Sequence, residues 1–272
     1  MSRSASQRFS RLRSGEGDYV MLVNCMALAQ KTSCLWAAAH VCYNLPHVAL
    51  RNVRPENTLL DINRMLDPAT LLALAIILLV SFPVHEFAHA FVAYRLGDDT
   101  AARQGRLSLN PLRHLDPLGT IMLIVTQAFG WAKPVPVAPW RLRYGPRAGH
   151  ALVSIAGPAS NLLMASVVAV VWRLGLLQRL PVDLDLTVFM FVSINITLFL
   201  FNLIPLGPLD GFSVLSGIVD ERTAQMMQPL YTYGPFILMG LLLLGNVVPG
   251  FNPLGRFLAE GTQATMRLLL GY

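Results

Sequence analysis

The segment ATLLALAIILLVSFPVHEFAHAF, residues 69–91, joins a long apolar run to three ionisable side chains. Its first 16 residues carry no charge, and His85, Glu86 and His89 then follow within little more than one helical turn. An ionisable residue at the centre of a membrane helix costs about 2.5–3.5 kcal/mol even on the lenient insertion scale, so it needs a partner. The segment therefore predicts a membrane helix over about residues 69–96 that carries a polar site near its end.

The composition indicates a membrane protein. Of 272 residues, 54% are hydrophobic and only 13% are charged, whereas a soluble domain is about one quarter charged. Apolar blocks approach the roughly 20 residues that cross a bilayer; they occupy residues 69–84, 151–172, 186–206 and 235–248. We predict an all-α polytopic membrane protein with about four transmembrane helices.

The net charge of +6 does not indicate nucleic acid as a partner. The basic residues lie in short loops between apolar blocks, which is typical of the cytoplasmic loops of membrane proteins. No stretch interleaves aromatic and basic residues as an RNA-binding face does. The lipid bilayer is therefore the expected partner, and nucleic acid is excluded.

Two further segments complete the predicted fold. Residues 118–130 hold about 13 mostly apolar residues, which suits a re-entrant or interfacial segment better than a span. The stretch GRLSLNP, residues 105–111, alternates in polarity and ends at a proline, so it predicts a short strand or β hairpin at the membrane edge. WAKPVPVAPW, residues 131–140, contains closely spaced prolines and is expected to be an extended loop.

The HExxH spacing of the first helix is typical of a zinc site. His85 and His89 are one helical turn apart and share a face, so both imidazoles can hold one metal ion. Glu86 is rotated away from that face, close enough to act as general base toward a water on the zinc.

Two histidines leave a catalytic zinc one protein ligand short. His114 and His150 lie beside arginines in polar surroundings, and we expect both to be surface histidines. Asp210 is the better candidate because it follows an apolar helix that Pro205 and Pro208 terminate, so a bent backbone can direct its carboxylate back into the bundle. We predict Asp210 as the third ligand.

Six motifs occur in one order over residues 69–220: HEFAHAF, GRLSLNP, HLDPLGTI, GWAKPVPV, AGPASNLLMA and FNLIPLGPLDG. Together they resemble the site-2 protease family of intramembrane zinc metalloproteases, most closely its short bacterial members without a PDZ domain. The resemblance implies hydrolysis of peptide bonds in a membrane protein or membrane-embedded peptide substrate. It also implies a multi-pass location in the bacterial plasma membrane.

The resemblance assigns roles to individual residues. It implies one zinc ion per chain on His85, His89 and Asp210, with Glu86 as the catalytic base. Asn202, eight residues before the aspartate, matches the asparagine that helps to bind the substrate or the oxyanion. For Asn161, in the AGPASN motif, we expect a packing role among small residues that let helices approach closely.

The domain organisation follows from the same motifs. Residues 1–64 match nothing in the family and form an atypical N-terminal extension, for which we expect disorder, a weak extra helix or a mis-assigned start. Residues 65–250 form the predicted metalloprotease domain. Residues 251–272 are expected to be an interfacial C-terminal helix.

A shared zinc ion also constrains the topology. HEFAH and PLDG both lie at the C-terminal ends of their helices, so those helices must run in the same direction. The helix at 150–175 must then run oppositely, and residues 118–130 cannot cross. The loops at 95–116 and 131–149 share one side, and their many arginines place that side in the cytoplasm.

Two other functions compete with proteolysis. A metal transporter would line several helices with acidic or histidine residues, but those at 150–175 and 233–248 carry none inside the membrane. A proteolytically silent homologue would only bind membrane partners. The intact HExxH and aspartate argue against that alternative.

Overall fold

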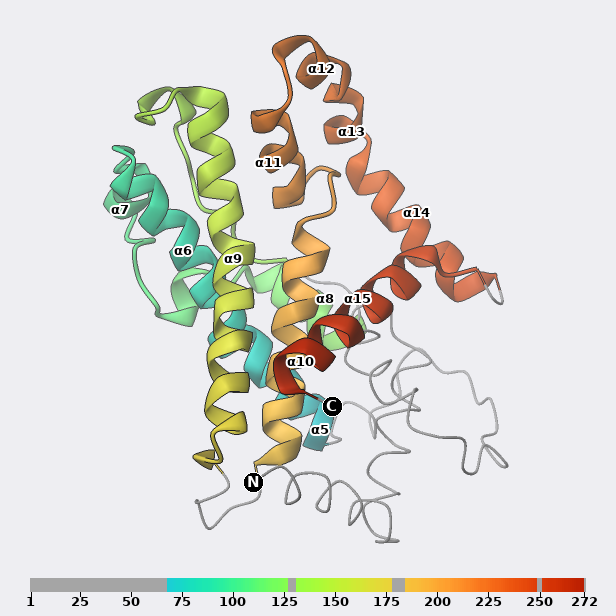
Figure 1. Cartoon of the computed structure of the whole chain (residues 1–272). Helices are drawn as coiled ribbons and strands as arrows, with labels where there is room; N and C mark the ends of the chain where they lie inside the picture. Colours follow the sequence, from blue (N-terminus) through green and yellow to red (C-terminus); the bar gives the residue numbers. More distant parts are fainter. Residues whose placement is uncertain (1–67, 127–130, 178–183, 249–250, 272) are drawn as a thin grey trace, which may run out of the picture.

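Three long apolar helices give the molecule its frame (Figure 1). The computed structural model describes residues 68–126, 131–177, 184–248 and 251–271, and the helices long and apolar enough to cross a membrane there are Leu71–Arg95, Pro146–Arg173 and Asp185–Asn202. In chain order the helices are α5 (Pro68–Ile76), a π-helical turn (Ile77–Ser81), α6 (Phe82–Arg95), α7 (Thr100–Arg103), α8 (Pro117–Thr126), α9 (Pro146–Arg173), α10 (Asp185–Asn202), α11 (Asp210–Ile218), α12 (Glu221–Met226), α13 (Gln228–Thr232), α14 (Gly234–Val247) and α15 (Pro253–Leu270), with 3₁₀ turns at Pro111–Arg113 and Pro139–Arg141.

The directions of the long helices match those that a shared metal requires. Helices α6 and α10 run the same way, and α9 runs against them (Figure 1). Small residues permit close packing of this bundle, because Ala90 and Ala93 on α6 and Ala165 and Ala169 on α9 are completely buried. The C-terminal ends of α6 and α10 therefore lie at one end of the bundle, together with α11.

The first helix is continuous over the predicted range, but it contains a π-helical turn that was not predicted. The N–H of Phe82 bonds to the carbonyl of Ile77, five residues back. Pro83 follows immediately; a proline has no N–H, and its ring clashes with the carbonyl four residues earlier. The wider turn accommodates that proline two residues before His85.

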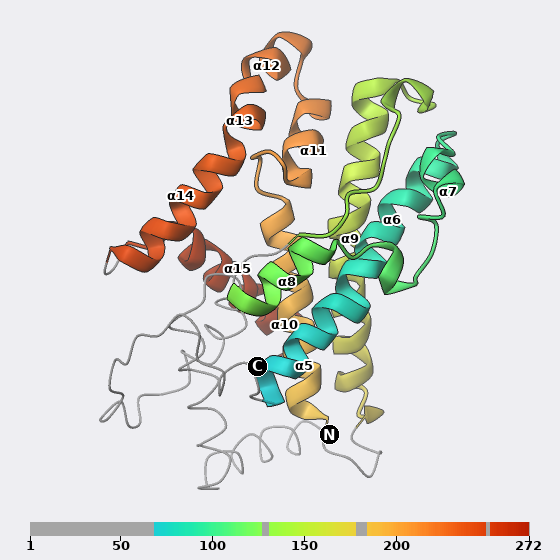
Figure 2. The ribbon, with the colours of Figure 1, turned by 180° about the vertical axis from the view of Figure 1, so that it is seen from behind.

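The predicted count of about four spans is not confirmed. Helix α14 has 14 residues, which at about 1.5 Å per residue is shorter than a hydrocarbon core of about 30 Å. Helix α8 has 10 residues and runs obliquely in front of α10 in Figure 2. Its length agrees with the expectation that residues 118–130 do not cross, although residues 127–130 lie outside the described structure.

The predicted membrane-edge hairpin is not confirmed either. Residues 105–110 have turn and irregular backbone, and across the described ranges the β pairing is a single antiparallel bridge between Leu115 and Ala132. Local hydrogen bonds replace strand pairing: the side chain of Asn110 accepts from the N–H of Leu112 and caps the 3₁₀ turn.

The C-terminal helix is present as predicted. Helix α15 crosses α10, where Thr262 and Thr197 share a hydrogen bond of 3.1 Å and Met266 is fully buried. Its placement at the membrane interface stays a prediction, as do the domain boundaries. The N-terminal extension, residues 1–64, lies outside the described residues.

A buried carboxylate fastens the loop after α8 to the end of α6. Asp98 is completely buried and accepts hydrogen bonds from Thr100 and, at 2.6 Å, from the backbone N–H of Ala138. Beside it, the N–H of Arg143 bonds to the carbonyl of Leu96. Burial alone would raise the pKa of Asp98, but the hydrogen bonds from Thr100 and Ala138 outweigh burial and lower that pKa below its usual range.

Asp98→Asn should destabilise the fold by about 2–3 kcal/mol near neutral pH, because an amide nitrogen cannot accept the Ala138 hydrogen bond. A carboxyl with a depressed pKa stabilises the fold above its unfolded value of about 3.9, and that contribution disappears as the pH falls through the folded value. The difference in melting temperature between wild type and variant, measured in detergent, should therefore shrink below about pH 4. An equal difference at every pH would contradict this account.

Candidate metal centre

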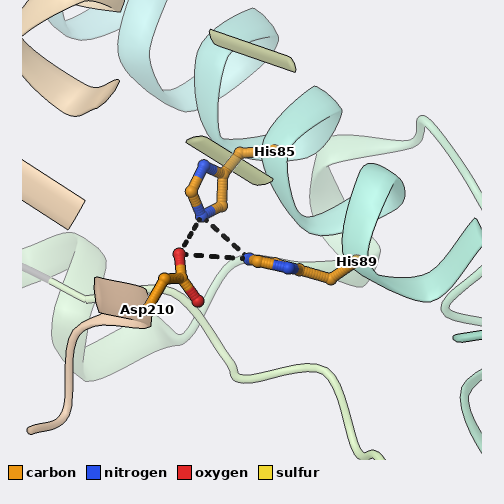
Figure 3. Close-up of side chains that lie close together, drawn as sticks. All are labelled: His85, His89 and Asp210. Atoms are coloured by element: carbon orange, nitrogen blue, oxygen red, sulfur yellow. Dashed lines mark hydrogen bonds and ion pairs between the residues drawn. The ribbon is translucent and has the colours of Figure 1, made fainter. Parts of the chain in front are cut away.

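His85 and His89 lie side by side on α6 with their Nε2 atoms 3.0 Å apart (Figure 3). Each residue is only 7% exposed, and the two rings meet edge to face. Because the residues are one turn apart on the helix, both imidazoles project from the same face. The sequence prediction that the two histidines converge is confirmed.

Asp210 brings a carboxylate to the same point from the far side of the bundle. It is the first residue of α11, and its Oδ2 lies 3.2 Å from His85 Nε2 and 3.4 Å from His89 Nε2. The chain bends sharply between α10 and α11: a Cβ at Gly211 would lie 2.2 Å from the carbonyl oxygen of Leu203. Only glycine fits this bend, which places Asp210 opposite the histidines (Figure 3).

The other nitrogen of each imidazole has a partner on α9. His89 Nδ1 lies 2.8 Å from the backbone carbonyl of Val153, and His85 Nδ1 lies 2.6 Å from Asn161 Oδ1. A carbonyl oxygen can only accept, so the Nδ1 of His89 carries a proton, and in the neutral imidazole Nε2 keeps the lone pair. With Asn161 Oδ1 as acceptor, the same holds for His85.

The remaining predicted site residues differ in their surroundings. Glu86 is half-buried, and within the described ranges its carboxylate has no hydrogen bond or ion pair. Asn202 ends α10, where its Nδ2 donates to the carbonyl of Leu198. In the described structure no hydrogen bond joins Asn202 to the three converging side chains, and its role in catalysis stays a prediction.

His114 and His150 were predicted to lie on the surface, but the structure buries the first completely and the second in part. His114 is completely buried, and its Nε2 lies 2.6 Å from the carbonyl of Ser108, so the surface prediction is wrong. The segment after α8 returns to this loop, where the N–H of Lys133 bonds to the carbonyl of His114. His150 on α9 is half-buried, so its predicted surface position is not confirmed.

Sequence reasoning missed the part that Asn161 plays beside His85. Its side chain is fully buried and hydrogen-bonded to that histidine, so the expected packing role is incomplete. The available signal was its spacing: Gly157 and Asn161 are one turn apart on α9, so they share the face that meets the histidines.

Comparison with known proteins finds a family model and several relatives that match this chain. The family model described as Peptidase family M50 matches residues 178–244, which include Asp210. The chain is 44% identical over 183 residues to "Putative zinc metalloprotease YwhC" of Bacillus subtilis, covering 64% of this chain and 83% of the relative. It is 32% and 30% identical to proteins named "Putative zinc metalloprotease Rip2" in Mycobacterium tuberculosis and Mycolicibacterium smegmatis, covering 61% of this chain and 64% of each relative.

No solved structure matches the chain significantly. The identity to the Bacillus subtilis relative extends over most of that protein's length, and the family model covers the segment that supplies the aspartate. The chain therefore belongs to peptidase family M50, the site-2 protease family, and is a membrane metalloprotease.

Proposed function

We propose that this protein is an intramembrane zinc metalloprotease of the cell membrane, one that cleaves peptide bonds in membrane-embedded protein substrates. His85, His89 and Asp210 would hold one zinc ion per chain, and Glu86 is the general base. One observation carries the proposal: two imidazole nitrogens and a carboxylate oxygen converge within 3.4 Å of one another inside an apolar bundle.

The residues present fit a zinc ion. In the neutral imidazoles all three converging atoms are acceptors, because both histidines then hold their single proton on Nδ1. Such a set repels itself unless a cation lies among the three atoms, and two histidines with one carboxylate are a common ligand set of catalytic zinc. These are also the described His, Cys, Asp and Glu residues that cluster closely enough to bind a metal.

The chemistry divides between the ion and the chain. When bound, zinc supplies a Lewis acid and makes water acidic enough to react near neutral pH. Glu86 accepts the proton of the attacking water as that water adds to the scissile carbonyl, and it later returns the proton to the leaving amine nitrogen. Its carboxylate is suited to this role because no protein group in the described structure forms a hydrogen bond or an ion pair with it.

The site lies well inside its helix. His85 is 14 positions after Leu71 and 10 before Arg95, the bounds of the first span. At about 1.5 Å per residue these separations are about 21 and 15 Å, so the site would lie within the bilayer and nearer the arginine-bearing side. This depth supports cleavage of a substrate inside the membrane.

The loop after α8 offers an edge for an unwound substrate. Pro134 and Pro136 alternate with Val135 and Val137, and no hydrogen bond in the described structure uses the N–H of either valine. In extended backbone, alternate N–H groups point to the same edge. We therefore propose that a substrate strand pairs along the valine edge, as in other cases of strand addition.

Gly157 on α9 leaves the space that the ion would need. A Cβ at this position would lie 2.3 Å from His89 Nε2 and 2.6 Å from His85 Nε2. A methyl group there would occupy the point where the two lone pairs meet.

Gly157→Ala should lose most of its zinc and at least 100-fold of its proteolytic activity, while the helix itself gains from the better helix former. Zinc content of the purified protein and cleavage of a co-expressed membrane substrate measure both effects. Gly240→Ala is the matched control, because a Cβ at Gly240 meets no atom within 4 Å. Normal zinc content in Gly157→Ala would show that the metal does not lie beside this glycine.

Glu86→Gln tests the proposed function directly. The amide keeps the shape of the side chain but cannot accept the proton, so general-base catalysis worth about 10²–10⁴-fold should disappear. Cleavage of a membrane-embedded substrate should fall by that factor while the zinc content stays near that of wild type. Near-normal cleavage by the variant would rule out Glu86 as the base.

A further inference from the structure

A chain of buried amides crosses the bundle from α10 to the metal centre. Asn195 Nδ2 donates to the carbonyl of Phe191 at 2.9 Å, and Asn161 Nδ2 donates to Asn195 Oδ1 at 2.9 Å. Asn161 Oδ1 then faces His85 Nδ1 at 2.6 Å. Both asparagines are completely buried, and polar groups buried in an apolar bundle must be hydrogen-bonded.

The backbone carbonyl of Phe191 fixes which way both asparagine amides point. The carbonyl of Phe191 can only accept, so Asn195 must turn its nitrogen toward that carbonyl and its oxygen toward Asn161. Asn161 must then direct its own nitrogen to Asn195 and its oxygen to His85. An imidazole nitrogen that faces an acceptor must carry the proton, so the lone pair of His85 lies on Nε2.

We infer that Asn161 and Asn195 are positioning residues that act as one relay and fix the metal-binding tautomer of His85. A ligand histidine whose second nitrogen loses its partner typically binds metal 10–100-fold more weakly. The inference assigns that role to Asn161 and extends it to Asn195, which does not touch the histidine. It rests on the metal centre proposed above.

Two substitutions of Asn161, one that removes the hydrogen-bond acceptor and one that keeps it, distinguish a relay role from a packing role. Asn161→Leu keeps the approximate volume but removes the acceptor, so zinc affinity should fall 10–100-fold. Asn161→Asp presents an acceptor whichever way it turns, so its affinity should stay within about threefold of wild type. A packing role gives the reverse order, because leucine suits an apolar bundle and a carboxylate does not.

The role of Asn195 is tested by measuring the effect of Asn195→Leu on zinc affinity with asparagine and with aspartate at position 161. Asn195→Leu should weaken zinc binding about 10-fold or more when position 161 is asparagine, since that amide is then free to flip. In the Asn161→Asp background the same change should have no further effect, because a carboxylate needs no orientation. Thr197→Val is the control: it removes a buried hydrogen bond from the same helix but lies outside the relay, so its zinc affinity should match wild type.

Zinc affinity of the full-length chain in detergent, measured by competition with a chromogenic chelator, decides between the outcomes. Tight binding by Asn161→Leu, or an equal loss from Asn195→Leu in both backgrounds, would overturn the relay while the metal centre stood. Absence of zinc binding by the wild type would instead overturn the metal centre itself. If Asn161→Leu fails to fold, comparing Asn195→Leu in the two backgrounds still distinguishes a relay from packing.

Discussion

The structure depends on the cost of placing ionisable side chains inside an apolar helix bundle. His85 and His89 lie in a helix whose preceding turns are uncharged, and each would be unfavourable alone at that depth. The fold offsets that cost by bringing both imidazoles and the carboxylate of Asp210 to one point. The parallel direction of α6 and α10, and the reversed direction of α9 between them, follow from that convergence (Figure 1).

Helix α9 contributes no ligand, yet it shapes the centre on two sides. Gly157 leaves the space in which the lone pairs meet, and the carbonyl of Val153 and the amide of Asn161 hold the outer nitrogens of the two histidines. The sharp bend at Gly211 then supplies the third converging atom. The hydrogen bond to each outer nitrogen fixes the orientation of its imidazole, which limits the movement of the inner nitrogen.

Much of this arrangement could be predicted from sequence, because it rests on local rules. Apolar run lengths locate the three long helices, and the spacing of His85 and His89 places them on one face. The π-helical turn before Pro83 and the Asn161–Asn195 contact could not be predicted, since they depend on how one helix meets another. His114 was misjudged because its neighbours in sequence are charged, whereas its burial comes from the return of the loop at Lys133.

The central claim is that two histidines and one aspartate hold a single metal ion. The zinc K-edge X-ray absorption spectrum of the purified full-length chain tests it most directly. The account predicts about one zinc per chain, with two imidazoles and an oxygen ligand at about 2.0–2.2 Å, and loss of that spectrum in the His85→Ala, His89→Ala double variant. A sulfur shell at about 2.3 Å, or an unchanged spectrum in the double variant, would contradict it.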